Sequence, residues 1–150
     1  MGRTSTTREP PSVTDSTQRE RFATHFPSVF AYVHTWAPDD ERCREIVVEA
    51  FARVFNRGTL LDDEDFPVAL FSVARDLCEG WRISSRGLNG GLSAPEREVL
   101  ALLFDAQLTR GQVGRLLELQ EDIVVSTLVR SLRKLKGVVT HSPSRSLQQL

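Results

Sequence analysis

The sequence predicts an all-α protein of two small helical domains joined by a short linker. Apolar residues recur at helical steps along much of the chain, a flexible stretch interrupts them, and a helix-turn-helix pattern follows over residues 108–137. We expect the following organisation: a disordered arm over 1–17, a helical domain over 18–84, the linker over 85–92, a helix-turn-helix domain over 93–138 and a flexible tail over 139–150.

The composition is typical of an ordinary soluble protein with a core of its own, because 40% of the 150 residues are apolar and 26% are charged. No apolar run is long enough to cross a membrane and the N-terminal residues show no secretory signal, so we expect a cytoplasmic protein without a membrane partner. Cys43 and Cys78 lie on the apolar sides of helical patterns, which favours reduced thiols. His25 and His34 stand nine residues apart, a spacing that predicts no metal site.

The first domain begins with an aromatic stripe at helical spacing, which we interpret as core. The stripe consists of Phe22, Phe26, Phe30, Val33 and Trp36. Pro27 either starts a new helix within it or kinks one. A second helix is expected to open at residues 38–40 and to stop at Gly58. A third is expected over residues 66–83, after an acidic run at residues 62–65 that suits a helix N-terminus.

The second domain is expected to start with a capped helix. Residues 84–91 are small and flexible and are typical of a linker, after which Ser93 and Glu96 form a capping-box pattern around Pro95. The core face expected for this helix consists of Val99, Leu100, Leu102, Leu103 and Phe104.

Residues 108–137 are typical of a helix-turn-helix. Thr109 and Gln112 form a second capping-box pattern, the first helix stops near Leu119, and a second helix starts at Glu121 and Asp122. The residues of the second helix that we expect to face inward are Val124, Leu128, Leu132 and Leu135. Those expected to point outward are Ser126, Thr127, Arg130, Arg133 and Lys134. This is the layout of a recognition helix.

Charge supports that interpretation without establishing it. Asp122 is the last acidic residue of a chain whose formal net charge is -1, and every charged residue after it is basic. Phosphate contact is therefore most favourable at this end. The alternative is that these cations only complement the dipole of the last helix and form a solvated face.

The two units together resemble a sigma-70 family initiation factor of the extracytoplasmic-function (ECF) type. Residues 25–55, HFPSVFAYVHTWAPDDERCREIVVEAFARVF, follow the region 2 pattern, and residues 65–82, DFPVALFSVARDLCEGWR, resemble the segment that ends in an aromatic-Arg pair. Residues 92–104, LSAPEREVLALLF, are similar to the entry helix of region 4. The resemblance covers residues 22–137.

The resemblance implies a protein without catalytic activity or cofactor that binds core RNA polymerase and promoter DNA. The residues implied at DNA in the second domain are Gln120, Glu121, Ser126, Thr127, Arg130, Arg133 and Lys134. Those implied to hold unstacked bases in the first are Phe71, Arg75, Trp81, Arg82 and Arg86. The residues implied at polymerase are Glu45, Val48 and Glu49. The resemblance leaves open an anti-sigma factor as a further partner.

Several positions depart from the family pattern. Val48 replaces an amide on the polymerase-binding helix, Glu118 stands in a turn that usually has glycine, and Val125 and Val129 replace polar residues of the recognition helix. Among the groups on base edges, valine can contact only thymine methyls, which predicts few sequence-specific contacts with bases. The alternative function is a sigma-like regulator that acts by protein contact with polymerase or another transcription factor.

Two further expectations concern chemistry and geometry. An enzyme has little support, because the sequence has no glycine-rich phosphate loop, no nucleophile elbow and no histidine paired with an acid at useful spacing. The linker from Arg86 to Ser93 spans at most about 25 Å, whereas two promoter elements lie about 58 Å apart on B-DNA. We therefore expect the two domains to pack on one another for at least part of the time.

Overall fold

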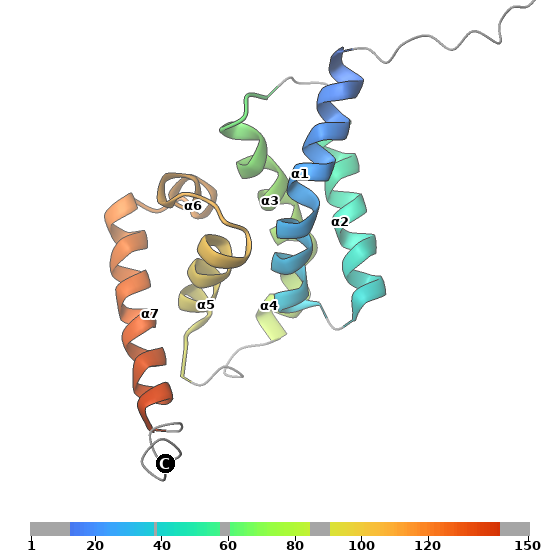
Figure 1. Cartoon of the computed structure of the whole chain (residues 1–150). Helices are drawn as coiled ribbons and strands as arrows, with labels where there is room; N and C mark the ends of the chain where they lie inside the picture. Colours follow the sequence, from blue (N-terminus) through green and yellow to red (C-terminus); the bar gives the residue numbers. More distant parts are fainter. Residues whose placement is uncertain (1–12, 38, 58–60, 85–90, 142–150) are drawn as a thin grey trace, which may run out of the picture.

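The computed structural model describes residues 13–37, 39–57, 61–84 and 91–141, and every regular element in these ranges is a helix (Figure 1). In chain order the elements are α1 (Val13–Trp36), α2 (Asp40–Phe55), α3 (Asp65–Leu77), α4 (Glu79–Ser84), α5 (Ala94–Leu100), η1 (Ala101–Asp105), α6 (Arg110–Leu117) and α7 (Glu121–His141). The predicted all-α class is confirmed. Within the described ranges, none of these helices has both the length and the apolar character needed to span a bilayer.

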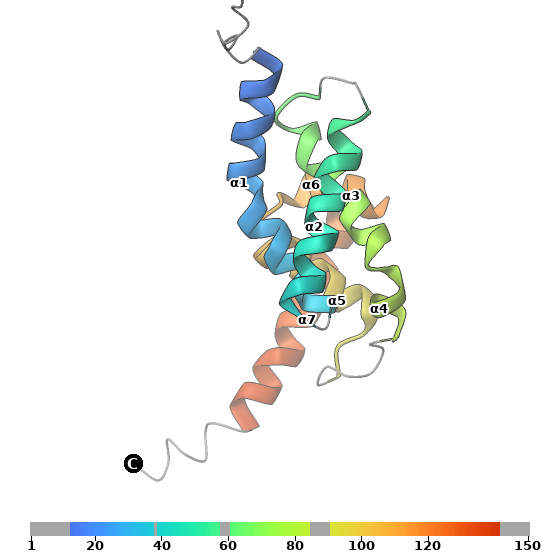
Figure 2. The same ribbon diagram turned by 90° about the vertical axis from the view of Figure 1, so that its right-hand side faces the viewer.

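The helices stack in layers across the molecule. α2 packs on α1 and α3 at one edge, α7 forms the opposite edge, and α5, η1 and α6 lie between them (Figures 1 and 2). The middle layer contacts both sides, since α5 and α6 pack on α7 while η1 packs on α1 and α6 packs on α3. The two units expected from the sequence are therefore in contact.

A single hydrophobic core runs through both units. It joins Val33 and Phe71 of the first unit to Val99, Leu102 and Val113 of the second, all of them buried. Apolar surface on the inner faces of both units is thereby removed from water, which is the main favourable term in folding. The described residues thus contain one shared core, not two separate ones.

Several predicted boundaries shift in the structure. α1 begins at Val13 and continues through Pro27, so the expected arm over 1–17 is wrong for its last five residues, and residues 1–12 lie outside the described ranges. α7 continues to His141, which corrects the expected start of the tail at 139, while residues 142–150 are not described. Most of the expected linker, residues 85–90, also lies outside the described ranges.

The helix expected over residues 66–83 is divided into α3 and α4. The break lies at Cys78, whose backbone N–H donates to both the Ala74 and Arg75 carbonyls before α4 starts at Glu79. Both cysteines are free and buried, as predicted, and burial raises the pKa of the Cys78 thiol to about 12. Cys78 is therefore an uncharged core side chain.

The entry helix of the second unit ends in a π turn. α5 passes into η1, where the Ala106 N–H donates to the Ala101 carbonyl at 2.9 Å, five residues back. The wider turn changes which residues share a face. Leu102 is buried but Phe104 is 58% exposed, so the prediction of Phe104 as core is wrong.

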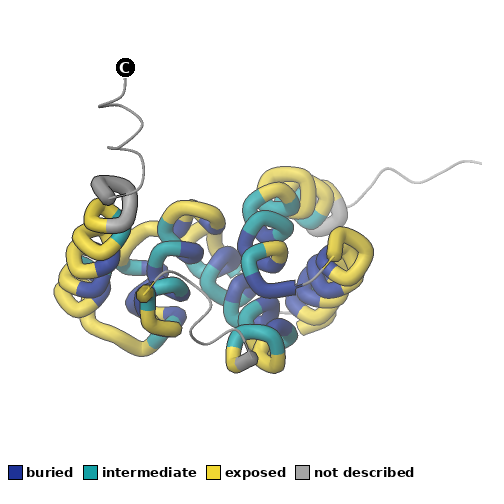
Figure 3. Tube along the Cα trace, turned by 90° about the horizontal axis from the view of Figure 1, so that it is seen from below, coloured by how far each residue is buried: buried dark blue, intermediate teal, exposed yellow. Residues whose placement is uncertain are grey.

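The buried face of α7 also differs from the predicted one. Val124, Thr127 and Ser131 are buried, whereas Leu132 is 45% exposed, so the expectation that Thr127 points outward and Leu132 inward is wrong. α7 packs on α5 and α6. The Ser131 hydroxyl donates to the Thr127 carbonyl at 2.7 Å, so this buried hydroxyl has a hydrogen-bond partner. The outward side of α7 is exposed along much of its length (Figure 3).

The turn between α6 and α7 depends on a close backbone approach. Glu118 ends α6 in the left-handed conformation, with φ 59°, and the Leu119 N–H then donates to the Gly114 carbonyl at 2.8 Å. A β-carbon at Gly114 would lie 2.7 Å from the Leu119 carbonyl oxygen, closer than real contacts allow. Gly114 therefore permits the tight turn of the helix-turn-helix.

Gly114→Ala is expected to lower the free energy of unfolding by about 1–3 kcal/mol, because the added methyl meets backbone that cannot move without opening the turn. Gly137→Ala is the matched control, since a β-carbon there meets nothing within 4 Å inside α7, and it should instead stabilise by about 0.5–1 kcal/mol. Urea denaturation of both variants measures the difference. Equal effects of the two substitutions would show that the turn does not require glycine.

Candidate nucleic-acid interface

The candidate interface is built on a helix-turn-helix whose first helix is firmly capped. The Thr109 hydroxyl accepts from the Gln112 N–H at 3.1 Å, and the Gln112 side chain accepts from the Thr109 N–H at 2.9 Å, as the sequence predicted. The Gln112 amide also donates to the Glu64 carbonyl at 2.9 Å, just before α3. The first helix of the motif is thus held against the first unit, and α7 is left at the edge of the molecule.

The exposed side of α7 carries polar and basic groups. Ser126, Arg130 and Arg133 are exposed there, and so is Lys136. Arg133 and Lys136 have no ion pair among the described residues. Gln120 and Glu121 are exposed at the start of the helix, where a recognition helix contacts base edges.

A buried carboxylate holds two of the cations predicted to contact DNA. Glu96 of α5 is only 1% exposed, and its oxygens lie 2.7 Å from Arg130 Nε and 2.8 Å from Lys134 Nζ. The same carboxylate accepts from the Ser93 N–H at 2.8 Å, which completes the predicted capping box. Hydrogen bonds from Lys134, the Ser93 backbone and Arg130 lower the pKa of Glu96 to about 2. Glu96 is therefore ionised and fixes the inner flank of α7.

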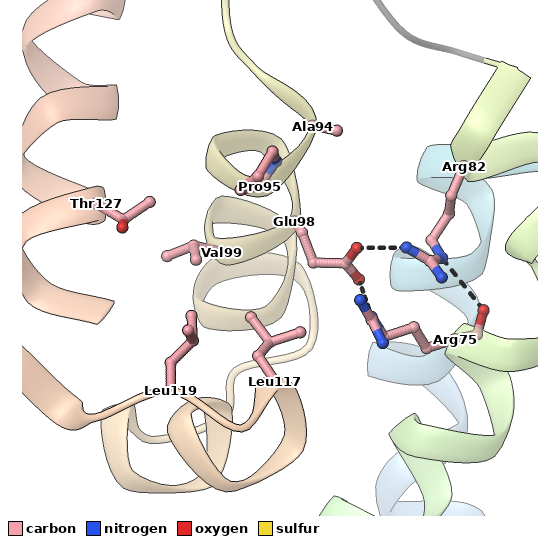
Figure 4. Close-up of a pocket in the computed structure, with 9 residues that line it drawn as sticks. All are labelled: Arg75, Arg82, Ala94, Pro95, Glu98, Val99, Leu117, Leu119 and Thr127. Carbon is pink, nitrogen blue, oxygen red and sulfur yellow. Dashed lines mark hydrogen bonds and ion pairs between the residues drawn. The ribbon is translucent and has the colours of Figure 1, made fainter. Parts of the chain in front are cut away.

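A second buried carboxylate holds two cations of the first unit. Glu98 of α5 accepts from the Tyr32 hydroxyl at 2.6 Å. It also accepts from Arg82 Nη1 at 2.8 Å and lies 3.0 Å from Arg75 Nε (Figure 4). Arg82 Nε also donates to the Arg75 carbonyl at 3.2 Å. Burial, followed by the adjacent Glu98 charge, raises the pKa of Tyr32 well above its usual value. Tyr32 therefore acts as a hydrogen-bond donor to Glu98.

A cavity of about 260 Å³ lies beside this carboxylate, between the two units. Arg75 and Arg82 line one wall, and Val99, Leu117 and Leu119 line the other (Figure 4). The cavity therefore places two guanidinium groups opposite an apolar surface, an arrangement that suits an anionic group attached to a flat apolar one.

The aromatic residues expected to hold unstacked bases are not equally available. Phe71 is fully buried and meets Tyr32 edge to face at 5.7 Å, so the prediction that its ring stacks on a base is wrong for this structure. Its position on the inner face of α3 explains the burial. Trp81 is half-buried, with the Arg42 guanidinium 6.0 Å from its ring centroid. Arg86 lies outside the described ranges.

The predicted polymerase-binding residues lie together on the exposed face of α2. Val48 is 54% exposed, and Glu45 and Glu49 are exposed beside it. Both carboxylates have partners along the helix: Glu45 pairs with Arg42 at 3.1 Å, and Glu49 pairs with Arg53 at 2.7 Å. Surface pairs of this kind are weak, so the carboxylates can exchange them for a partner's groups.

The sequence predicted the capping role of Glu96 but did not reveal that either acid of α5 holds cations of other helices. One signal was present. Glu96 and Glu98 are two residues apart, and residues at that spacing do not share a helix face, so two acids that flank Arg97 must point to different neighbours. Which neighbours they meet depends on contacts far away in the sequence.

The comparisons with other proteins add no family. The chain matches no protein-family model, no curated protein and no solved structure.

Glu96→Gln is expected to remove a pH-dependent part of the stability while keeping the cap. Because the pKa of Glu96 falls from 4.5 to about 2 on folding, its ionised form adds stability that is complete above about pH 4.5 and is lost as the pH falls toward about 2. The melting temperatures of wild type and variant should therefore differ most near neutral pH and converge below about pH 4.5. Thermal melts followed by circular dichroism test this.

The control for that comparison is Glu20→Gln, which removes an exposed carboxylate on α1 that has no ion pair among the described residues. A difference between wild type and Glu96→Gln that stays constant down to about pH 3 would mean that Glu96 is not held by its cations in solution.

Proposed function

We propose that the protein is a sigma-like transcription factor that binds core RNA polymerase and directs initiation through promoter DNA. The observation that carries the proposal is the capped helix-turn-helix with the exposed basic groups of Arg133 and Lys136 on its second helix. The resemblance to ECF sigma factors supports the same function. Phosphate contacts from these groups would position α7 in the major groove, and Gln120 and Ser126 would face base edges.

The polymerase contact is proposed for α2. Its exposed face presents the apolar Val48 between Glu45 and Glu49, on the edge of the molecule opposite α7 (Figure 1). An apolar centre with a charged rim is the usual anatomy of a protein interface. With polymerase at one edge and DNA at the other, one chain would connect the two.

The second candidate is a sigma-like regulator that acts by protein contact, with little base readout. A specific observation favours it: Val129, Leu132 and Phe104 are exposed apolar side chains. A cavity of about 440 Å³ lies next to Leu132 and Phe104, between α7 and the middle layer. Exposed apolar groups beside a cavity are typical of protein-binding surfaces.

Replacing both Arg133 and Lys136 by Ala is expected to weaken binding to duplex DNA and to lower the slope of log K against log salt by about 1 per lost phosphate contact. Fluorescence anisotropy with a labelled promoter-length duplex at several salt concentrations measures both quantities. The matched control replaces Arg44 and Arg57, which are exposed in the first unit, and removes the same charge. If the two double variants bind alike, α7 does not meet phosphate.

Val48→Asp is expected to reduce co-purification with core RNA polymerase about tenfold or more without changing the melting temperature, because it places a charge at the centre of the proposed contact. Val129→Asp makes the same change on α7. Loss of polymerase binding only in Val129→Asp would favour the second candidate. Transcription from a defined start site by the wild-type protein with core polymerase tests the function as a whole.

A further inference from the structure

We propose that the structure is a closed, self-inhibited state in which Glu98 occupies the two arginines of the first unit that single-stranded nucleic acid would bind. The inference rests on the proposed function, and it concerns Arg75 and Arg82, which the resemblance to ECF sigma factors implies at unstacked bases. It concerns a carboxylate of the second unit that serves as an internal substitute for a phosphate group.

The geometry of Glu98 matches that role. Its side chain is 6% exposed, and each carboxylate oxygen faces a different guanidinium: Oε1 faces Arg82 and Oε2 faces Arg75. Carboxylate and phosphate are both anions that guanidinium groups bind through paired N–H donors. Arg82 donates a hydrogen bond to Glu98 and Arg75 forms an ion pair with it, so a backbone phosphate held by both arginines would have to displace this carboxylate.

The size of the cavity beside Arg75 and Arg82 also indicates that a nucleic-acid strand cannot bind them in the closed state. A cavity of about 260 Å³ leads to these guanidinium groups, with Arg75 and Arg82 on one side and Leu117 and Leu119 on the other. A strand several nucleotides long does not fit between these walls. Binding of a strand therefore requires α5 and α6 to move away from α3 and α4.

Other contacts also join the units: the shared hydrophobic core, and hydrogen bonds from Gln112 to the Glu64 carbonyl and from Arg97 to the Thr35 carbonyl. The other charged contacts across the boundary are exposed. Arg115 pairs with Asp65, and both side chains are exposed by more than 40%. The Thr35 hydroxyl donates to the exposed Asp105 carboxylate at 3.1 Å. Exposed pairs contribute little, whereas breaking a buried one is costly, so the pairs of Glu98 are the ion pairs between the units on which closure mainly depends.

The test replaces Glu98 by Gln in the full chain. The substitution removes both ion pairs that join α5 to α3 and α4, which favours separation of the units and frees both guanidinium groups for a ligand. Affinity for a fluorescein-labelled oligodeoxythymidylate of about 15 nucleotides should rise about tenfold. The radius of gyration from small-angle X-ray scattering should rise in the same variant.

Two further variants of the chain serve as controls. Glu20→Gln on α1 changes the net charge equally and should leave both quantities as in wild type. Adding Arg75→Ala and Arg82→Ala to Glu98→Gln should abolish the gain in affinity while the larger radius remains. If Glu98→Gln loses its helical circular dichroism, Tyr32→Phe replaces it, because it removes one hydrogen bond from Glu98 without a change of charge and should raise the affinity about two- to threefold.

The possible outcomes distinguish failure of the proposed closure by Glu98 from failure of the proposed function. A larger radius of gyration without any oligonucleotide binding would support closure by Glu98, but it would contradict nucleic acid as the ligand of Arg75 and Arg82. Unchanged radius and unchanged affinity in a folded Glu98→Gln protein would overturn the inference, even if the wild type binds duplex DNA through α7.

Discussion

Three successive side chains of α5 hold the layers of this molecule together. Glu96 binds cations of α7, Arg97 donates to the Thr35 carbonyl of α1 at 3.0 Å and lies over the Trp36 ring, and Glu98 binds groups of α1, α3 and α4. Consecutive helical residues point about 100° apart, so three in a row reach three sides of the helix. Because both carboxylates are buried, each requires its partners, and α5 is thereby fixed between the two outer layers.

These contacts also decide which cations are available for binding. Arg75, Arg82, Arg130 and Lys134 all have the chemistry expected of residues at nucleic acid, yet each is paired with a carboxylate of α5. The charges that stabilise the fold are thus the same ones that we propose for nucleic-acid binding. A ligand that takes one of these cations competes with the structure itself, so binding and conformation are coupled.

The sequence by itself determined the features that depend on near neighbours. The capping boxes at Ser93 and Thr109 were predictable because their partners lie three residues away, and the helical spacing of apolar residues predicted the all-α class. The helix-turn-helix followed from the same local signals. The predicted ends of the helices were less accurate. α7 extends past residue 138 and α3 ends at Leu77, because small differences in packing decide where a helix ends.

Only the tertiary structure decided which helix faces are buried and which charges meet. The Tyr32–Glu98 hydrogen bond joins residues 66 positions apart, and nothing near either residue indicates the other. Phe104 and Leu132 have the spacing of core residues, but a π turn and the close packing of α7 on α5 leave both exposed. Local patterns specify helices because backbone hydrogen bonds join near neighbours, whereas the partners of a buried charge depend on the packing of the whole chain.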